Sequence, residues 1–129
     1  MMVAEKESDQ LSFFSEITET DFKQTKSYLS KYRKLKLDIE DYEKKNPNVT
    51  SKGLEEAKSH VGALERATAL IIDPDVRRII DHRYLKGNRH KSVVMYFRSI
   101  MSESTIDRKI EEGIGSIASS LKLWAEFTR

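Results

Sequence analysis

Hydrophobic residues recur at spacings of three and four along the first half of the chain. From a start that Asp21 or Thr20 can cap, the first series is Tyr28, Tyr32, Leu35, Ile39 and Tyr42. This spacing places the series on one face of a helix that packs against another helix. The run ends at Asn46-Pro47-Asn48, because proline disfavours helix at the residue before it and asparagine favours turns.

A second series follows once Thr50 or Ser51 has capped a new helix. Its members are Leu54, Ala57 or Lys58, Val61, Leu64, Thr68 and Ile71. Two such helices joined by a short turn predict an antiparallel helical hairpin. The same faces can also pair between two chains, so a homodimer stays open.

The pattern changes at Asp73-Pro74, where an N-cap is followed by a residue suited to the first helical position. The inward positions of this helix are Val76, Ile79, Ile80, the aliphatic stem of Arg83, and Tyr84. Gly87 is placed for a left-handed C-cap. A short helix over residues 90–98 then buries Val93, Val94 and Phe97.

The turn after this short helix is Ser99-Ile100-Met101, with an Ile or Met expected to be buried, and Ser102 caps the last helix. The inner stripe of that helix is Ile106, Ile110, Ile114, Ile117 or Ala118, Leu121 and Trp124. Gly113 and Gly115 interrupt it and predict a kink or a close helix crossing. A short helix, a tight turn and a capped longer helix are the order of a helix-turn-helix.

Composition supports an all-α fold with two parts. The chain has 129 residues, of which 38% are hydrophobic and 34% charged, a balance typical of long helices with one apolar stripe. Two prolines and five glycines provide few turns for an all-β protein. We expect a helical, coiled-coil-like arm over residues 1–72 and a helix-turn-helix DNA-binding domain over residues 73–129. Near the N-terminus, Phe13 and Phe14 are expected to cover one end of the core.

Charge is distributed unevenly between the two halves. Residues 1–75 hold 12 Lys or Arg against 15 Asp or Glu, a net of −3, whereas residues 76–129 hold 11 against 6, a net of +5. The basic half is therefore the candidate for binding a polyanion, double-stranded DNA above all. With no cysteine, no signal peptide and no apolar run long enough for a membrane span, we expect a cytoplasmic protein without membrane contact.

The predicted motif assigns roles to individual side chains. The first turns of a recognition helix must present groups that hydrogen-bond to base edges. The residues predicted to read bases are Glu103, Ser104, Thr105, Asp107 and Arg108. Residues that flank the first helix of the motif or the start of the second are predicted to contact the DNA backbone. They are Arg89, His90, Lys91, Arg98, Ser102 and Lys109.

Two stretches carry a resemblance to a known family. Residues 75–87 (DVRRIIDHRYLKG) and 101–110 (MSESTIDRKI) resemble region 4 of bacterial sigma-70 factors, which reads the promoter −35 element. The layout, a charged helical half followed by this module, resembles phage late-gene regulators of the ArpU, RinA and LtrC type. That resemblance implies an activator of packaging or lysis genes in a bacterial host cell. The alternative is a sigma-like adaptor or inhibitor that binds RNA polymerase or another regulator without reading DNA.

Signatures of enzymes are missing from the sequence. It contains no GxxxxGK[ST], GxGxxG, HExxH or GxSxG motif. The three histidines, at positions 60, 82 and 90, stand apart with no second ligand at helical spacing. We therefore expect no enzymatic activity, no cofactor and no metal.

Overall fold

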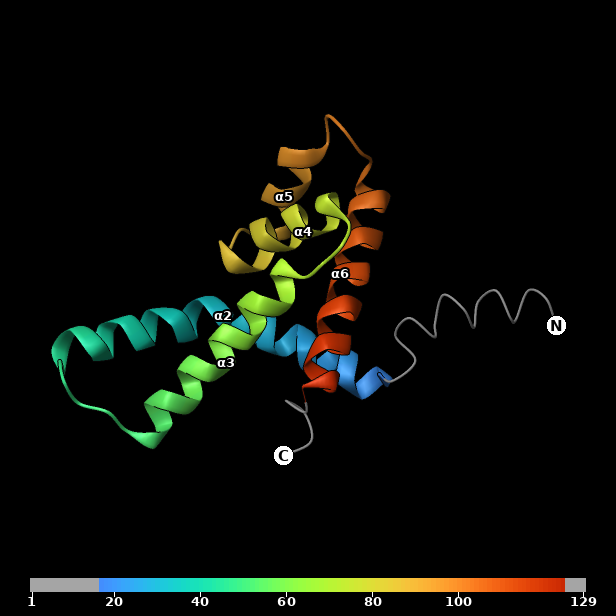
Figure 1. Ribbon diagram of the computed structural model, residues 1–129. Helices are drawn as coiled ribbons and strands as arrows, with labels where there is room; N and C mark the ends of the chain where they lie inside the picture. Colours follow the sequence, from blue (N-terminus) through green and yellow to red (C-terminus); the bar gives the residue numbers. More distant parts are fainter. Residues whose placement is uncertain (1–16, 125–129) are drawn as a thin grey trace.

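A computed structural model describes residues 17–124, and this part of the chain is all-helical, with no strand. The N-terminal segment that contains Phe13 and Phe14 lies outside the described residues. The elements are α2 (Glu19–Lys45), α3 (Lys52–Ala69), α4 (Pro74–Ile80), the π-helical turn η1 (Asp81–Leu85), α5 (His90–Phe97) and α6 (Glu103–Leu123) (Figure 1). None of these helices is long and apolar enough to cross a membrane.

The start of α2 differs from the expectation by a few residues. Thr18 is the N-cap, and its side chain accepts a hydrogen bond from the backbone N–H of Asp21, while the Asp21 carboxylate accepts one from the Thr18 backbone. This reciprocal pair is a capping box. Asp21 is thus the third helical residue, and neither Asp21 nor Thr20 is the cap, because Asp21 is needed to bond back to Thr18.

Asp21 also ties α2 to the far end of α6. Lys122 Nζ lies 3.0 Å from Asp21 Oδ2. Burial of Asp21 works against its ionised form, but the hydrogen bonds from Lys122 and Thr18 outweigh burial and hold the pKa of Asp21 below its usual range. The two ends of the described chain are therefore joined by a charged contact.

Helices α2 and α3 run in opposite directions side by side. Lys36 Nζ on α2 pairs with Glu65 of α3 at 2.8 Å, and Glu43, further along α2, pairs with Lys58, which lies earlier on α3, also at 2.8 Å. The connection turns at Asn48, whose φ of 69° is left-handed. Ser51 then caps α3 by accepting from the Leu54 N–H.

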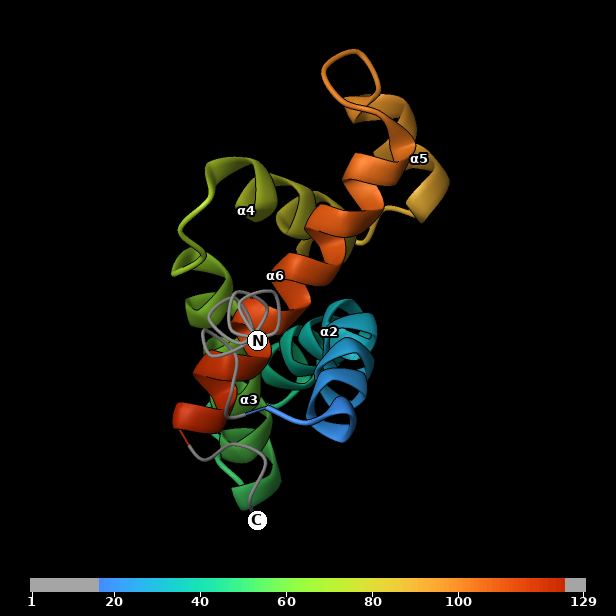
Figure 2. The same ribbon diagram turned by 90° about the vertical axis from the view of Figure 1, so that its right-hand side faces the viewer.

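One hydrophobic core contains residues of both halves. Helix α6 contacts α2, α3 and α4, so it runs through the middle of the molecule (Figure 2). Side chains buried in this core include Leu29, Tyr32, Leu64, Val76, Ile80, Phe97, Ile114 and Ile117. The core thus continues across the change of pattern at residue 72.

The predicted close crossing occurs at Gly113. A Cβ added there would lie 2.4 Å from Ile80 Cγ1 and 3.0 Å from Val76 Cγ1, so glycine lets α4 and α6 approach. Helix α6 remains continuous through both glycines. After η1, Gly87 adopts the expected left-handed conformation, with a φ of 78°.

Candidate nucleic-acid interface

The connection between α5 and α6 is a tight turn closed by backbone hydrogen bonds. The carbonyl of Phe97 accepts from the N–H groups of Ile100 and Met101, at 3.0 and 3.1 Å. Ser102 caps α6 as expected, its Oγ accepting from the Thr105 N–H at 3.3 Å. Met101 is half-buried against the core, whereas Ile100 is 60% exposed, so of the two only Met101 packs inward.

Helix α5 is held by its buried residues and by one ring stack. Val93 and Phe97 are almost completely buried. His82 of the preceding turn stacks on Tyr96, with ring centroids 4.5 Å apart, and its ring also meets the edge of Phe97. His82 is therefore a boundary residue in an aromatic cluster.

Four of the predicted DNA-contacting cations are exposed. They are Arg89, Lys91, Arg98 and Arg108. None of them forms an ion pair with a carboxylate anywhere in residues 17–124. Arg89 and Lys91 lie at the start of α5, Arg98 follows its end, and Arg108 lies in the first turns of α6. Their charges are available to an external anion such as a phosphate.

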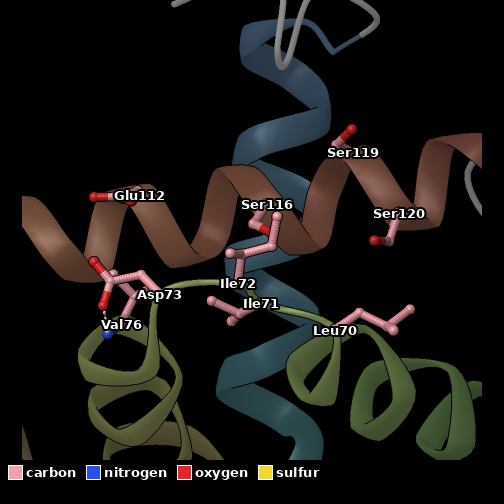
Figure 3. Close-up of a pocket in the computed structure, with 9 residues that line it drawn as sticks. All are labelled: Leu70, Ile71, Ile72, Asp73, Val76, Glu112, Ser116, Ser119 and Ser120. Atoms are coloured by element: carbon pink, nitrogen blue, oxygen red, sulfur yellow. Dashed lines mark hydrogen bonds between the residues drawn. The ribbon is translucent and has the colours of Figure 1, made fainter.

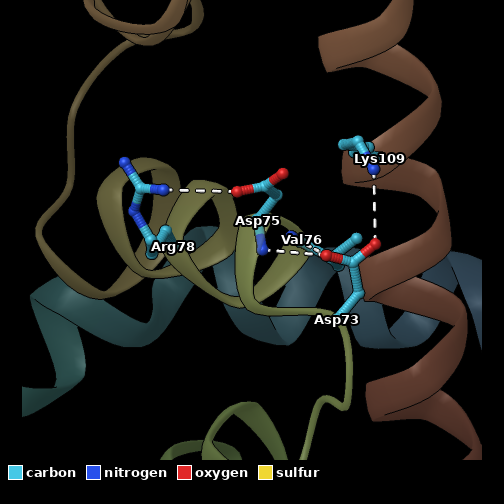
Figure 4. Close-up of polar contacts among 5 residues, drawn as sticks. All are labelled: Asp73, Asp75, Val76, Arg78 and Lys109. Carbon is cyan, nitrogen blue, oxygen red and sulfur yellow. Dashed lines mark hydrogen bonds and ion pairs between the residues drawn. The ribbon is translucent and has the colours of Figure 1, made fainter. Parts of the chain in front are cut away.

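Two other predicted contacts are occupied within the protein. Lys109 Nζ lies 3.3 Å from Asp73 Oδ2, and its side chain is only 19% exposed (Figure 4). His90 Nε2 lies 2.6 Å from Asp107 Oδ1. Sequence spacing did not reveal either pair, because the partners belong to different elements.

Asp73 makes two contacts, one with the backbone of α4 and one with a side chain of α6. Its Oδ1 accepts from the backbone N–H of Asp75 at 2.8 Å, which caps α4, while its other oxygen faces Lys109 of α6 (Figure 4). The backbone hydrogen bond from Asp75 and the hydrogen bond from Lys109 hold the pKa of Asp73 below its usual range. This carboxylate therefore holds the start of α4 against the N-terminal part of α6, at Lys109.

The predicted base-reading residues share one exposed segment of α6. Glu103, Ser104, Asp107 and Arg108 are exposed, and Thr105 is half-buried. Thr105 Oγ1 and Ser104 Oγ lie 3.0 and 3.2 Å from the capping Ser102 Oγ. Three hydroxyl groups therefore form a local network, while the longer charged side chains extend from the same turns.

The structure also brings together three groups that sequence spacing had kept apart. The side chains of His90, Glu103 and Asp107 offer one ligand atom each within 4.8 Å of one another. The sequence alone predicts that Glu103 and Asp107 lie close together, because they are four residues apart on one helix face. It did not indicate that the histidine of α5 packs beside them.

A pocket lies at a different part of α6, away from these residues. Its volume is about 240 Å³, and it is formed between the α3–α4 connection and α6 (Figure 3). The residues that line it are Leu70, Ile71, Ile72, Asp73, Val76, Glu112, Ser116, Ser119 and Ser120. In Figure 3, Asp73 is directed to the Val76 backbone, in its role as the α4 cap. On α6, the pocket therefore lies beside residues 112–120 and not beside the predicted base-reading residues 103–108.

No protein-family model, curated protein or solved structure matches this chain.

Proposed function

We propose that this chain is a sequence-specific DNA-binding transcriptional regulator, in which α5 and α6 form the helix-turn-helix. The supporting observation is the contrast within α6. Its first turns are exposed, and Arg108 there, like Arg89, Lys91 and Arg98 of the α5 region, has no carboxylate partner among residues 17–124, while Ile106, Ile110 and Ile114 anchor the opposite face in the core. A recognition helix needs this combination, since it has to enter the major groove without leaving the scaffold.

Within this proposal, the chemistry of each side chain assigns it to reading bases, neutralising phosphates or holding the helix in position. Arg108 donates to a guanine edge, Ser104 and Thr105 bond to either partner of a base pair, and Glu103 and Asp107 accept from cytosine amino groups. Arg89, Lys91 and Arg98 neutralise phosphates, and the half-exposed His90 lies among them. Ser102 and Lys109 hold the helix in position through the cap and the Asp73 pair.

The resemblance to sigma region 4 and to the ArpU, RinA and LtrC regulators supports a narrower form of the proposal. The protein is then a phage or prophage activator of late packaging or lysis genes. Helices α2 and α3 form the helical hairpin of the arm, which is available for a second subunit or for host RNA polymerase.

A second candidate function is supported by exposed apolar side chains near the same turn. Met95, Tyr96 and Ile100 are 58%, 63% and 60% exposed. Apolar side chains gathered on a surface mark protein interaction sites. The chain is then an adaptor that binds polymerase without reading DNA. Pull-down of purified polymerase in the absence of DNA separates this function from the first one.

A gel shift tests the main proposal directly. The purified chain is mixed with DNA from upstream of the operon beside its own gene, and with a duplex of equal length and shuffled sequence. We expect binding that prefers the upstream fragment and weakens as salt is raised, since phosphate contacts release counterions. Equal binding to both duplexes, or none, would overturn the proposal.

A further inference from the structure

The cluster of His90, Glu103 and Asp107 joins the two helices at the exposed end of the molecule. His90 is the first residue of α5, and the two carboxylates lie in the first turns of α6. One imidazole nitrogen and two carboxylate oxygens meet within 4.8 Å, and the closest pair, His90 Nε2 and Asp107 Oδ1, is 2.6 Å apart. The donors thus come from two elements that only the folded chain brings together.

The charge of this cluster is poorly balanced by the protein itself. No Lys or Arg in the described part of the chain forms an ion pair with Glu103 or Asp107. Lys109, the nearest lysine in sequence, is directed to Asp73 instead. Like charges four residues apart on a helix repel each other. A bound cation would remove that repulsion.

The donor set selects a type of cation. Imidazole together with carboxylate suits zinc, whereas magnesium and calcium prefer oxygen ligands alone. Zinc binds nitrogen and carboxylate oxygen at about 2.0–2.2 Å, so donors around one tetrahedral ion lie roughly 3.5 Å apart. The wider pairs of this cluster therefore have to close by roughly 1 Å, and the His90–Asp107 pair, at 2.6 Å, has to open by somewhat less than that. Rotation of these exposed or half-exposed side chains allows both changes. We propose that His90, Glu103 and Asp107 form a binding site for one Zn²⁺ ion that tunes DNA binding.

The effect on DNA follows from the position of the site, and this step depends on the proposed function. Two negative charges in the first turns of a recognition helix repel phosphates. A divalent cation cancels them and at the same time fastens α5 to α6. Zinc therefore raises affinity for any duplex, independently of its sequence. While zinc is bound, Glu103 and Asp107 are its ligands and do not accept from cytosine, so base reading then depends on Ser104, Thr105 and Arg108.

Calorimetry tests the site without DNA. The full chain, first treated with a chelator and then freed of it, is titrated with zinc chloride. We expect one ion per chain, and little heat from magnesium chloride at the same concentration. His90→Gln, Glu103→Gln and Asp107→Asn each remove one ligand, and each is expected to weaken zinc binding by at least about tenfold.

Glu112→Gln is the matched control, because it makes the same change on the same helix beside the pocket of Figure 3. It is expected to leave zinc binding unchanged. Absence of binding to the parent chain, or equal binding by parent and Asp107→Asn, would overturn the site. Circular dichroism of each variant confirms that it is folded.

Fluorescence anisotropy with a labelled duplex of arbitrary sequence tests the effect on DNA. Zinc is expected to tighten binding by the parent on the order of tenfold. The double variant E103Q/D107N is expected to bind this duplex tightly without zinc and not to respond to it. Zinc binding with unchanged DNA affinity overturns the regulatory role alone, whereas zinc binding with no DNA binding at all contradicts the proposed function and leaves the metal site intact.

Discussion

The two ends of α6 have opposite surroundings, although they belong to one continuous helix. Beyond Gly113, the residues Ile114, Ile117 and Leu121 are completely or almost completely buried against α2, α3 and α4. Before Ile110, most side chains other than Ile106 are exposed, and the neighbours are α5, through His90, and the start of α4, through Asp73 (Figures 1 and 2). The helix is a core element at one end and a surface element at the other.

This difference separates stability from function along a single helix. Substitutions at the inner end should change the free energy of unfolding, because they remove or add atoms in a packed interior. Substitutions at the outer end should change binding and leave stability nearly unaltered, because their side chains face solvent. The following predictions test this separation, from the largest effect to the smallest.

Truncation at the inner end should give the largest loss. Ile117 is completely buried, so Ile117→Ala is expected to lower the free energy of unfolding by about 2–5 kcal/mol. Ile100→Ala, the same change at an exposed position beside the outer end, should stay within about 0.5 kcal/mol of the parent. Urea denaturation followed by circular dichroism measures both. Equal losses would show that the outer end is also packed.

The helix crossing can be tested by replacing two glycines with alanine, because the two substitutions are expected to change stability in opposite directions. At Gly113, a methyl group meets the fully buried Ile80, and this overpacking, about 1–3 kcal/mol, should outweigh the roughly 1 kcal/mol that alanine gains in a helix. Gly62 on α3 has nothing within 4 Å of the added carbon, so Gly62→Ala should stabilise the protein. Melting temperatures that rise for both variants would contradict the close crossing.

At the outer end, two cations should affect DNA binding differently. Arg108→Ala should reduce the preference for the upstream fragment over a shuffled duplex by about 1–3 kcal/mol. Lys91→Ala should weaken binding to both duplexes and lower the salt slope by roughly one unit. Lys44→Ala, at the far end of α2, is the control for loss of charge alone. The proposed roles fail if all three variants lose affinity equally.

The smallest effect concerns Asp73, which links α4 to the outer part of α6. Asp73→Ala removes both the cap and the Lys109 pair and should cost about 1 kcal/mol of stability. Asp73→Asn keeps an oxygen for the cap, so it should lower the stability by only about a few tenths of a kcal/mol. The difference between the parent and Asp73→Asn isolates the ion pair, and the difference between Asp73→Asn and Asp73→Ala isolates the cap.

The same residue predicts a dependence on pH. Its pKa is lower in the folded protein than its ordinary value of 3.8, so the folded state binds this proton more weakly than the unfolded state does. The contribution of the charge is therefore complete above pH 3.8 and is lost as the pH falls through the lower folded value. The difference between parent and Asp73→Asn should shrink on acidification. A difference that grows in acid would contradict the assigned pair.

Much of the fold could be predicted from local signals. The start of α4 at Pro74, the Ser102 cap, the left-handed Gly87 and the inner stripe of α6 were each predicted from residue type and spacing. For the cap of α3 the sequence left Thr50 and Ser51 open, and the structure has Ser51. The errors were at places where two signals competed. Asp21 is a good cap by type, but its carboxylate bonds back to Thr18.

For the candidate site, the sequence predicted several exposed side chains but not the contacts that others make within the protein. The exposed cations follow from their places at helix ends. The partners of His90 and Lys109 do not, since they lie 17 and 36 residues away in the chain. Spacing along one helix does not reveal such partners, so both residues were predicted to contact the DNA backbone.

The sequence by itself determined which segments are helical and which face of each is apolar, because caps, turn residues and periodicity act over a few neighbouring residues. Tertiary structure alone decided that Gly113 meets Ile80, that Asp73 holds Lys109 and that His90 lies beside Glu103 and Asp107. Those contacts depend on how whole helices cross, and crossing geometry is set by packing of the complete core.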